Sequence, residues 1–204
     1  MNHKAPAVKA ATPTATATGD GFPSTGVLDT FNRANGGLGT NWSGATSGYS
    51  VSSNQNLVGS GGDLYWRSSS FGANQEAYVT LASINASSTE IDLVLKAQSN
   101  TTYAGGLIEV WYSPANNRVQ VWTYAAAQGW VQRGADITAT FAAGDRFGAQ
   151  ALANGQVRVY KNGVLLATRD ASGWTYAASS GYIGMWMVSA TTSRLDDFGG
   201  GTLP

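Results

Sequence analysis

Two acidic residues in the stretch TEIDLVLK, Glu90 and Asp92, have the spacing that carboxylate chemistry requires. They are two positions apart, so on a β-strand both side chains leave the same face. A glycosidase that retains the anomeric configuration needs two carboxyl groups about 5–5.5 Å apart, one as nucleophile and one as acid. The alternation of apolar and polar residues predicts an ordinary solvated strand face that carries Glu90, Asp92 and Lys96.

The same stretch is similar to the Glu-x-Asp-x-x-Glu strand of laminarinase-type endoglucanases, which are also jelly-roll sandwiches. Its third acidic position holds Leu95. With that acid missing, the strand alone does not supply the catalytic pair, and we expect no hydrolase activity. The chain has no cysteine and a single histidine, His3, so thiol catalysis, a zinc-thiolate site and a Ser-His-Asp triad are also excluded.

A second candidate site lies in the stretch GLIEVWYSPANNRVQVWTYA. A turn over residues 114–117 would make it a β-hairpin. The cross-strand pairs would then be Tyr112 with Val119, Val110 with Val121, and Ile108 with Thr123. These residues form an apolar face that is expected to point into the core.

The opposite face of this hairpin combines aromatic rings with hydrogen-bonding side chains. Rings of this kind stack on the apolar faces of sugars, while carboxylates and amides bind the hydroxyl groups. Alternatively, other strands, a loop or the N-terminal segment cover the rings, and a slip of one residue would exchange the two faces. Arg118 shares this face with the candidate carbohydrate-binding residues, which are Glu109, Trp111, Gln120, Trp122 and Tyr124.

Three further acids are candidates for a structural calcium site. Asp29 lies in the expected first strand, and Asp196 and Asp197 lie in the expected last strand. If those strands pair, the three carboxylates could share a calcium ion with backbone carbonyls. No other cofactor is expected.

The elements that must position these residues are short strands. The chain contains 26 glycines and only 12% charged residues, and from Leu28 onward its apolar residues alternate with polar ones between frequent turn residues. This pattern predicts an all-β, two-sheet antiparallel sandwich. Asn162-Gly163 predicts a tight hairpin with Lys161 opposite Val164 and Arg158 opposite Ala167.

The charge balance and the apolar content of the chain bear on whether it binds nucleic acid or inserts into a membrane. The chain has 12 basic and 12 acidic residues, so it has no excess positive charge that would bind nucleic acid phosphates. It has no apolar run of about 18 residues, so no membrane insertion is expected, and its N-terminus has no apolar signal region. The Ala/Thr/Pro-rich stretch from Met1 to Gly26 is interpreted as an extended arm or linker, and residues 27–204 as one sandwich domain.

Three stretches together resemble the concanavalin A-like, laminin-G-like sandwich family. They are LDTFNRANGGLGTNW, AGDRFGAQALANGQVRVYKNGVLLAT and SRLDDFGGGT, and they span Leu28 to Thr202. The first resembles modules of bacteriophage structural proteins and of large secreted bacterial proteins. The resemblance implies two packed antiparallel sheets, terminal strands that lie together, and binding rather than catalysis.

These observations favour a non-catalytic virion surface protein, a capsid decoration or minor tail component, with a lectin-like sandwich for glycans. Such a protein is assembled in the host cytoplasm and contacts other virion subunits through its arm. The alternative is a carbohydrate-binding module of a secreted, extracellular glycan-active enzyme. A glucanase or lyase is the third hypothesis.

Overall fold

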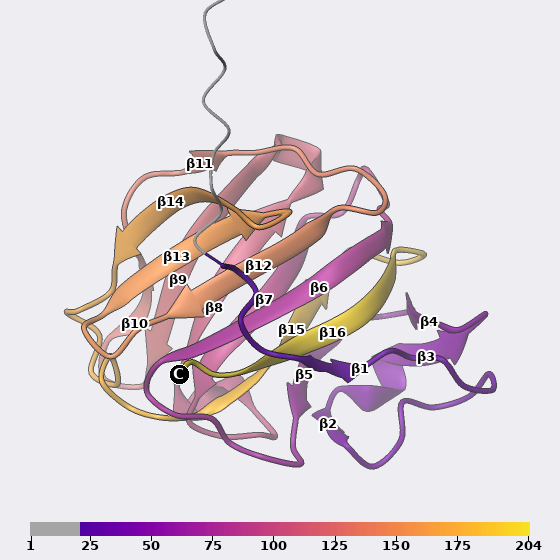
Figure 1. Cartoon of the computed structure of the whole chain (residues 1–204), viewed down its shortest axis with the longest axis horizontal. Helices are drawn as coiled ribbons and strands as arrows, with labels where there is room; N and C mark the ends of the chain where they lie inside the picture. Colours follow the sequence, from indigo (N-terminus) through magenta and orange to yellow (C-terminus); the bar gives the residue numbers. More distant parts are fainter. Residues whose placement is uncertain (1–20) are drawn as a thin grey trace, which may run out of the picture.

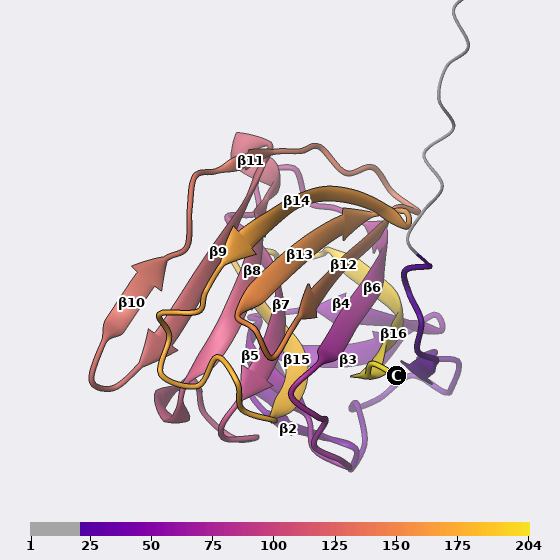
Figure 2. The same cartoon turned by 60° about the vertical axis from the view of Figure 1, so that its left-hand side comes forward.

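The computed structural model describes residues 21–204, which form two antiparallel β-sheets packed face to face. Figures 1 and 2 show the two layers, with β14, β13, β12, β6 and β16 in one and β9, β8, β7 and β15 in the other. The predicted all-β sandwich is therefore confirmed. The described residues contain no helix that is long and apolar enough to cross a membrane.

The two sheets interleave along the sequence. In spatial order, sheet A consists of β14 (Val164–Asp170), β13 (Gln156–Lys161), β12 (Arg146–Ala151), β6 (Gln75–Ser83), β16 (Arg194–Thr202), β4 (Gln55–Val58) and β3 (Tyr49–Ser52), with β1 (Val27–Asp29) paired to β16. Sheet B consists of β10 (Gly129–Gln132), β9 (Arg118–Ala125), β8 (Leu107–Ser113), β7 (Glu90–Ala97), β15 (Tyr182–Val188), β5 (Gly62–Trp66) and β2 (Trp42–Gly44), with β11 (Ile137–Thr138) paired to β9. Short 3-10 turns cover Thr46–Gly48, Tyr103–Gly105 and Pro114–Asn116.

The core lies between the sheets and follows the expected period of two. On β8 and β9 the observed pairs are Tyr112 with Val119, Val110 with Val121 and Ile108 with Thr123, as the sequence predicts. Val110 and Val121 are buried in the main apolar cluster. The other face of this hairpin therefore points away from the core.

The opening stretch anchors the sandwich. Asp29 accepts hydrogen bonds from the backbone N–H of Phe31, from the Arg33 guanidinium and from the indole Nε1 of Trp42. Arg33 also donates to the carbonyl of Leu38, so it braces the glycine-rich turn. Trp42 packs against Trp66 and Phe198 in the core. This stretch is a structural element of the fold, as expected from its turn residues.

The described end of the N-terminal arm lies on the outer face of sheet A. The Phe22 ring stacks on Tyr160 with centroids 4.1 Å apart. It occupies space that only a glycine leaves free, because a Cβ at Gly148 would approach the Phe22 ring to 2.2 Å. Ser24 and Thr25 donate hydrogen bonds to the carboxylate of Glu76. The rest of the expected arm, residues 1–20, lies outside the described residues.

Two local expectations from the sequence are wrong. The Asn162-Gly163 turn pairs Lys161 with Val164, but a register shift between Val159 and Tyr160 places Arg158 opposite Thr168 instead of Ala167. Lys96, expected on a solvated face, is buried. It has a left-handed φ of 48° beside an irregularity in the β7–β15 pairing, and its Nζ donates to the carbonyls of Leu152 and Ala177. A bulge reverses the side on which a side chain emerges, which alternation alone does not reveal.

Candidate functional site

The outer face of sheet B brings together side chains from five adjacent strands, β10, β9, β8, β7 and β15. On β8, Trp111 pairs with Asp92 of β7, and Asp92 pairs in turn with Trp186 of β15. Two residues away along β8, in the next row on the same face, Glu109 pairs with Trp122 of β9. Paired residues on neighbouring strands project from the same face at about 4.5–5.5 Å between Cβ atoms. The pairing thus places Asp92 between Trp111 and Trp186 in one row, and Glu109 beside Trp122 in the next row.

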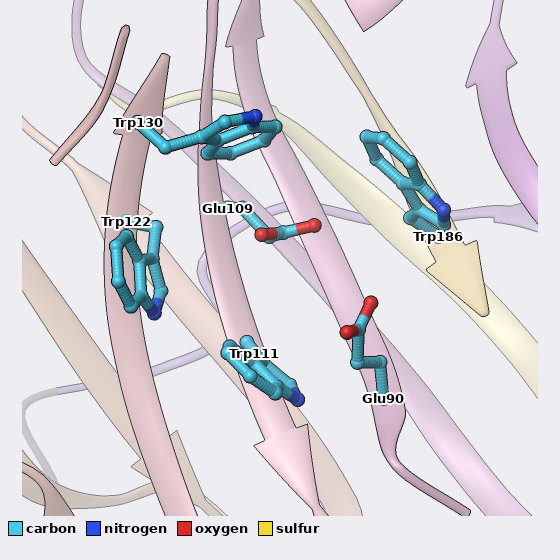
Figure 3. A pocket seen from close by; sticks show the side chains of 6 residues that line it. All are labelled: Glu90, Glu109, Trp111, Trp122, Trp130 and Trp186. Carbon is cyan, nitrogen blue, oxygen red and sulfur yellow. The ribbon is translucent and has the colours of Figure 1, made fainter. Parts of the chain in front are cut away.

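These rows form a groove of about 360 Å³, which we call the tryptophan groove. In Figure 3 the carboxyl groups of Glu109 and Glu90 point into the space between the four indole rings. The volume is within the range of about 300–1,000 Å³ that is typical of small-molecule sites. The groove is lined by Glu90, Glu109, Trp111, Trp122, Trp130 and Trp186.

Ring contacts hold the walls of the groove in place. Trp111 and Trp122 lie together, with ring centroids 6.3 Å apart. At the other end Tyr103 contacts both Trp130 and Trp186, at 5.9 Å and 5.2 Å. Trp130 is 39% exposed, so its ring presents a free apolar surface to solvent. The indole rings are positioned before any ligand arrives, which reduces the entropy that binding would cost.

Three carboxyl groups meet where Glu90 and Glu109 line the groove and Asp92 is buried beside them, and we call these three residues the acidic trio. One oxygen from each lies within 4.8 Å of one from each of the others. Burial, aided by the neighbouring acids, raises the pKa of Glu109 to about 8 and the pKa of Asp92 well above its usual range. Burial also raises the pKa of the half-buried Glu90. Shifted pKa values of this kind, at groups that lie in a groove, cluster at functional sites.

The structure places the predicted sugar-binding residues on one face, and three of them line the groove: Glu109, Trp111 and Trp122. Gln120 lies beside it and accepts a hydrogen bond from the Trp122 indole, while its amide donates to Asp136. Tyr124 packs on the ring of Trp130, with centroids 5.0 Å apart. Gln120 and Tyr124 therefore support the walls of the groove.

The expectation of a solvated face around Glu90 and Asp92 is wrong for Asp92, which is fully buried. Trp111 and Trp186 flank it on the two neighbouring strands. The acid that Leu95 does not supply is replaced in space by Glu109, which lies opposite Val94 on the adjacent strand. The strand considered for catalysis and the hairpin considered for sugar binding thus belong to one site.

Sequence reasoning missed Trp130, Trp186 and Tyr103. Trp130 pairs with Tyr124 across a short turn, so the hairpin rule could have found it. Trp186 reaches the groove through the pairing of β15 with β7, strands far apart in the sequence. No local signal specifies that pairing.

The calcium candidates do not form a comparable cluster. The first and last strands do pair, with Asp29 opposite Phe198. The Asp29 carboxylate, however, is occupied by Arg33 and the Trp42 indole. Among the residues that the structure describes, the acidic trio is the group whose oxygens come together at metal-binding distances, and Asp196 and Asp197 are not part of it.

Comparison with known proteins identifies the fold. No protein-family model matches the sequence, and no curated protein matches it either. Several solved structures share the sandwich. The carbohydrate-binding module CBM66 from Bacillus subtilis has a TM-score of 0.53 and 13% identity, over 78% of this chain and 92% of that one. A putative glycosyl hydrolase from Parabacteroides distasonis has a TM-score of 0.53 and 9% identity, over 80% and 94%.

A glycoside hydrolase family 16 endo-glucanase from Bacteroides ovatus is also similar, with a TM-score of 0.50 and 13% identity, over 67% of this chain and 72% of that one. The neighbours therefore include both a binding module and enzymes, all with concanavalin A-like sandwiches. At these identities the likeness establishes the fold alone.

Proposed function

We propose that this protein binds a carbohydrate chain in the tryptophan groove without cleaving it. The observation that carries the proposal is the groove itself, in which four indole rings surround carboxyl groups on an exposed sheet face. Sugars have apolar ring faces and hydroxyl edges, and this combination of side chains matches both. Fold neighbours that bind or act on glycans add support to the choice of ligand class.

Affinity electrophoresis through gels that contain a panel of polysaccharides tests this proposal. Trp130→Ala removes an exposed ring, and we expect it to weaken retention about tenfold, as for an aromatic residue at the centre of an interface. Trp122→Ala is expected to act in the same direction. Leu165→Ala is the matched control, because it removes a side chain of similar exposure, 45%, from sheet A.

Unchanged retention of both tryptophan variants on every polysaccharide that retains the native protein would show that the groove is not the binding site. Equal losses in Leu165→Ala would show that the effect does not come from the groove.

Hydrolysis is the second candidate function, and the position of Glu109 favours it. The acidic trio contains an ionisable pair, Glu90 and Glu109, on either side of the groove floor. Glu109, with its raised pKa, has the character of a general acid. The binding proposal predicts no release of reducing sugar from β-glucans. Release that is lost in both Glu90→Gln and Glu109→Gln would establish the hydrolase instead.

We further propose that the protein is a virion surface component, a capsid decoration or minor tail protein, and that residues 1–26 attach it to neighbouring subunits. The resemblance of the opening segment to phage modules supports this setting. The contacts of Phe22, Ser24 and Thr25 also support it, since they fix the end of the arm firmly on the domain. A carbohydrate-binding module of a secreted, extracellular enzyme is the alternative setting.

The copy number of this chain in purified virus particles distinguishes the virion proposal from the secreted-enzyme alternative. The virion proposal predicts this chain at stoichiometric copy number in them, and its absence would refute that proposal. Deletion of residues 1–20 leaves Phe22 and its contacts in place, and is expected to abolish attachment to particles while retention on polysaccharide persists.

A further inference from the structure

Asp92 is an exception to the usual behaviour of buried carboxyl groups. It is 0% exposed, and no N–H group or hydroxyl in residues 21–204 donates to either of its oxygens; its one hydrogen-bond partner there is the carboxyl group of Glu109. Buried polar atoms in folded proteins nearly always have a hydrogen-bond partner, so each exception requires an explanation. Its nearest ionisable neighbours are Glu90 and Glu109, which are acids as well.

No positive charge compensates this group within the described part of the chain. The ion pairs found there are Arg33–Asp29, Arg118–Asp136 and Lys161–Asp145. The groups that act electrostatically on Asp92 and Glu109 are other members of the trio. Three carboxylates close together in a partly desolvated site repel one another, and either bound protons or a bound cation must offset that repulsion.

We propose that Glu90, Asp92 and Glu109 bind a calcium ion at the floor of the tryptophan groove. Calcium takes oxygen ligands at about 2.3–2.6 Å, so oxygens on opposite sides of one ion lie about 4.6–5.2 Å apart. The trio offers three oxygens within 4.8 Å of one another. The Asp92 carboxylate, whose one hydrogen-bond partner in the described residues is Glu109, contributes the buried ligand, and Glu90 and Glu109 approach from the open side.

The ligand set favours calcium over other metals. It consists of carboxylates alone, without the nitrogen or sulfur ligands that zinc prefers. Calcium accepts six to eight ligands in flexible geometry, whereas magnesium requires near-octahedral ligands at about 2.0–2.1 Å. Three protein carboxylates leave coordination positions free on the open side of the groove. Sugar hydroxyls can occupy those positions, a role that rests on the proposed glycan-binding function.

Terbium luminescence is the direct test, because Tb³⁺ occupies calcium sites and is excited by nearby indole rings. Native protein is treated with chelator, exchanged into chelator-free buffer and titrated with Tb³⁺. We expect sensitised emission about tenfold above that of Asp92→Asn, displaced by added Ca²⁺. Asp196→Asn is the matched control: it removes a partly buried acid of sheet A and should retain full emission.

Thermal unfolding provides a second readout that does not depend on the indole rings. At saturating Ca²⁺ the native protein and Asp196→Asn should gain about 5 °C in melting temperature, whereas Asp92→Asn and Glu109→Gln should gain none. Circular dichroism of the two site variants establishes that they are folded. Native protein with no emission above that of Asp92→Asn, or equal calcium shifts in all variants, would overturn the cation site.

The two proposals fail in different ways. If the native protein is retained by polysaccharide but shows no terbium emission, only the cation site is refuted. Retention that is absent from the native protein while terbium binds refutes only the glycan. If retention is the same in Ca²⁺ and in chelator, the ion takes no part in holding the sugar.

Discussion

Glu76 and Asp92 are both fully buried acids on the outer face of a sheet, yet their surroundings are opposite. Glu76 of sheet A accepts hydrogen bonds from the backbone N–H groups of Ser24 and Thr25, from the Thr25 hydroxyl and from the Gln150 amide. Asp92 of sheet B has no such donor in the described residues. A buried carboxylate saturated with donors is compensated by the fold, whereas one without such donors requires a bound proton, water or ion to offset its burial.

The difference arises from what covers each face. The segment that contains Phe22, Ser24 and Thr25 lies across sheet A, so the chain itself supplies both a ring and the donors. On sheet B the indole rings cover Asp92 from the sides and leave the groove open. One face is thus completed by the chain, and the other is available to a ligand.

Among the substitutions, the largest effect is expected from Phe22→Ala. Phe22 is 7% exposed, and its removal leaves an empty space over Tyr160 and Gly148. We expect the free energy of unfolding to fall by about 3 kcal/mol, as for other buried aromatic residues. Urea unfolding measures the change, with Leu165→Ala as the exposed control on the same sheet. A change equal to that of the control would show that the segment does not cover the sheet.

Glu76→Gln should cost less, about 2 kcal/mol in the same urea experiment. The amide keeps one accepting oxygen and presents an NH₂ group to donors that previously shared a carboxylate. A neutral result would mean that the hydrogen bonds to Glu76 contribute no net stability, and the proposed contrast between Glu76 and Asp92 would then be wrong.

The acidic trio on sheet B predicts that, in the presence of chelator, the stability of the fold falls as the pH rises. The pKa values of Asp92, Glu109 and Glu90 are raised in the folded state, so the folded protein binds more protons than the unfolded chain. Stability is therefore complete below the unfolded pKa of about 4 and falls as the pH rises toward 8, by about 1 kcal/mol per pH unit. Unfolding midpoints between pH 5 and pH 8 test this sign, and a rise over that range would contradict it.

The smallest effect has the opposite sign from those on sheet A. In chelator at pH 7.5, Asp92→Asn removes a carboxyl group that must either bind a proton or repel its acidic neighbours, and we expect it to stabilise the fold by about 1 kcal/mol. It should also flatten the pH dependence of the native protein. Destabilisation by Asp92→Asn as large as that by Glu76→Gln would show that the two acids play the same structural role.

Local rules predicted much of this molecule. The period of two and the turn after Ser113 gave the correct β8–β9 register, which placed Trp111, Trp122 and Glu109 on one face. The Asn162-Gly163 turn was also located correctly, and only the register shift beyond Tyr160 was missed. Hairpins are predictable because their two strands share one short turn.

The site as a whole was not predictable, because it depends on pairing between distant segments. Trp186 lies beside the buried Asp92, and β15 is brought next to β7 by the global topology. Glu109 joins the trio only because of the register between β7 and β8. These two strands are connected by a loop rather than by a tight turn, so no turn rule predicts their register. Lys96 shows the same limit, since a bulge reversed its predicted side.

The placement of Phe22, Ser24 and Thr25 on sheet A has a mechanical consequence. A force applied to the chain at residue 21 enters the domain through the contacts with Tyr160 and Glu76, and then passes into the hydrogen-bond ladders of sheet A. The groove is built on the ladders of sheet B, across the apolar core. The domain can therefore carry tension between a tether and its surroundings without distorting the surface that holds the ligand.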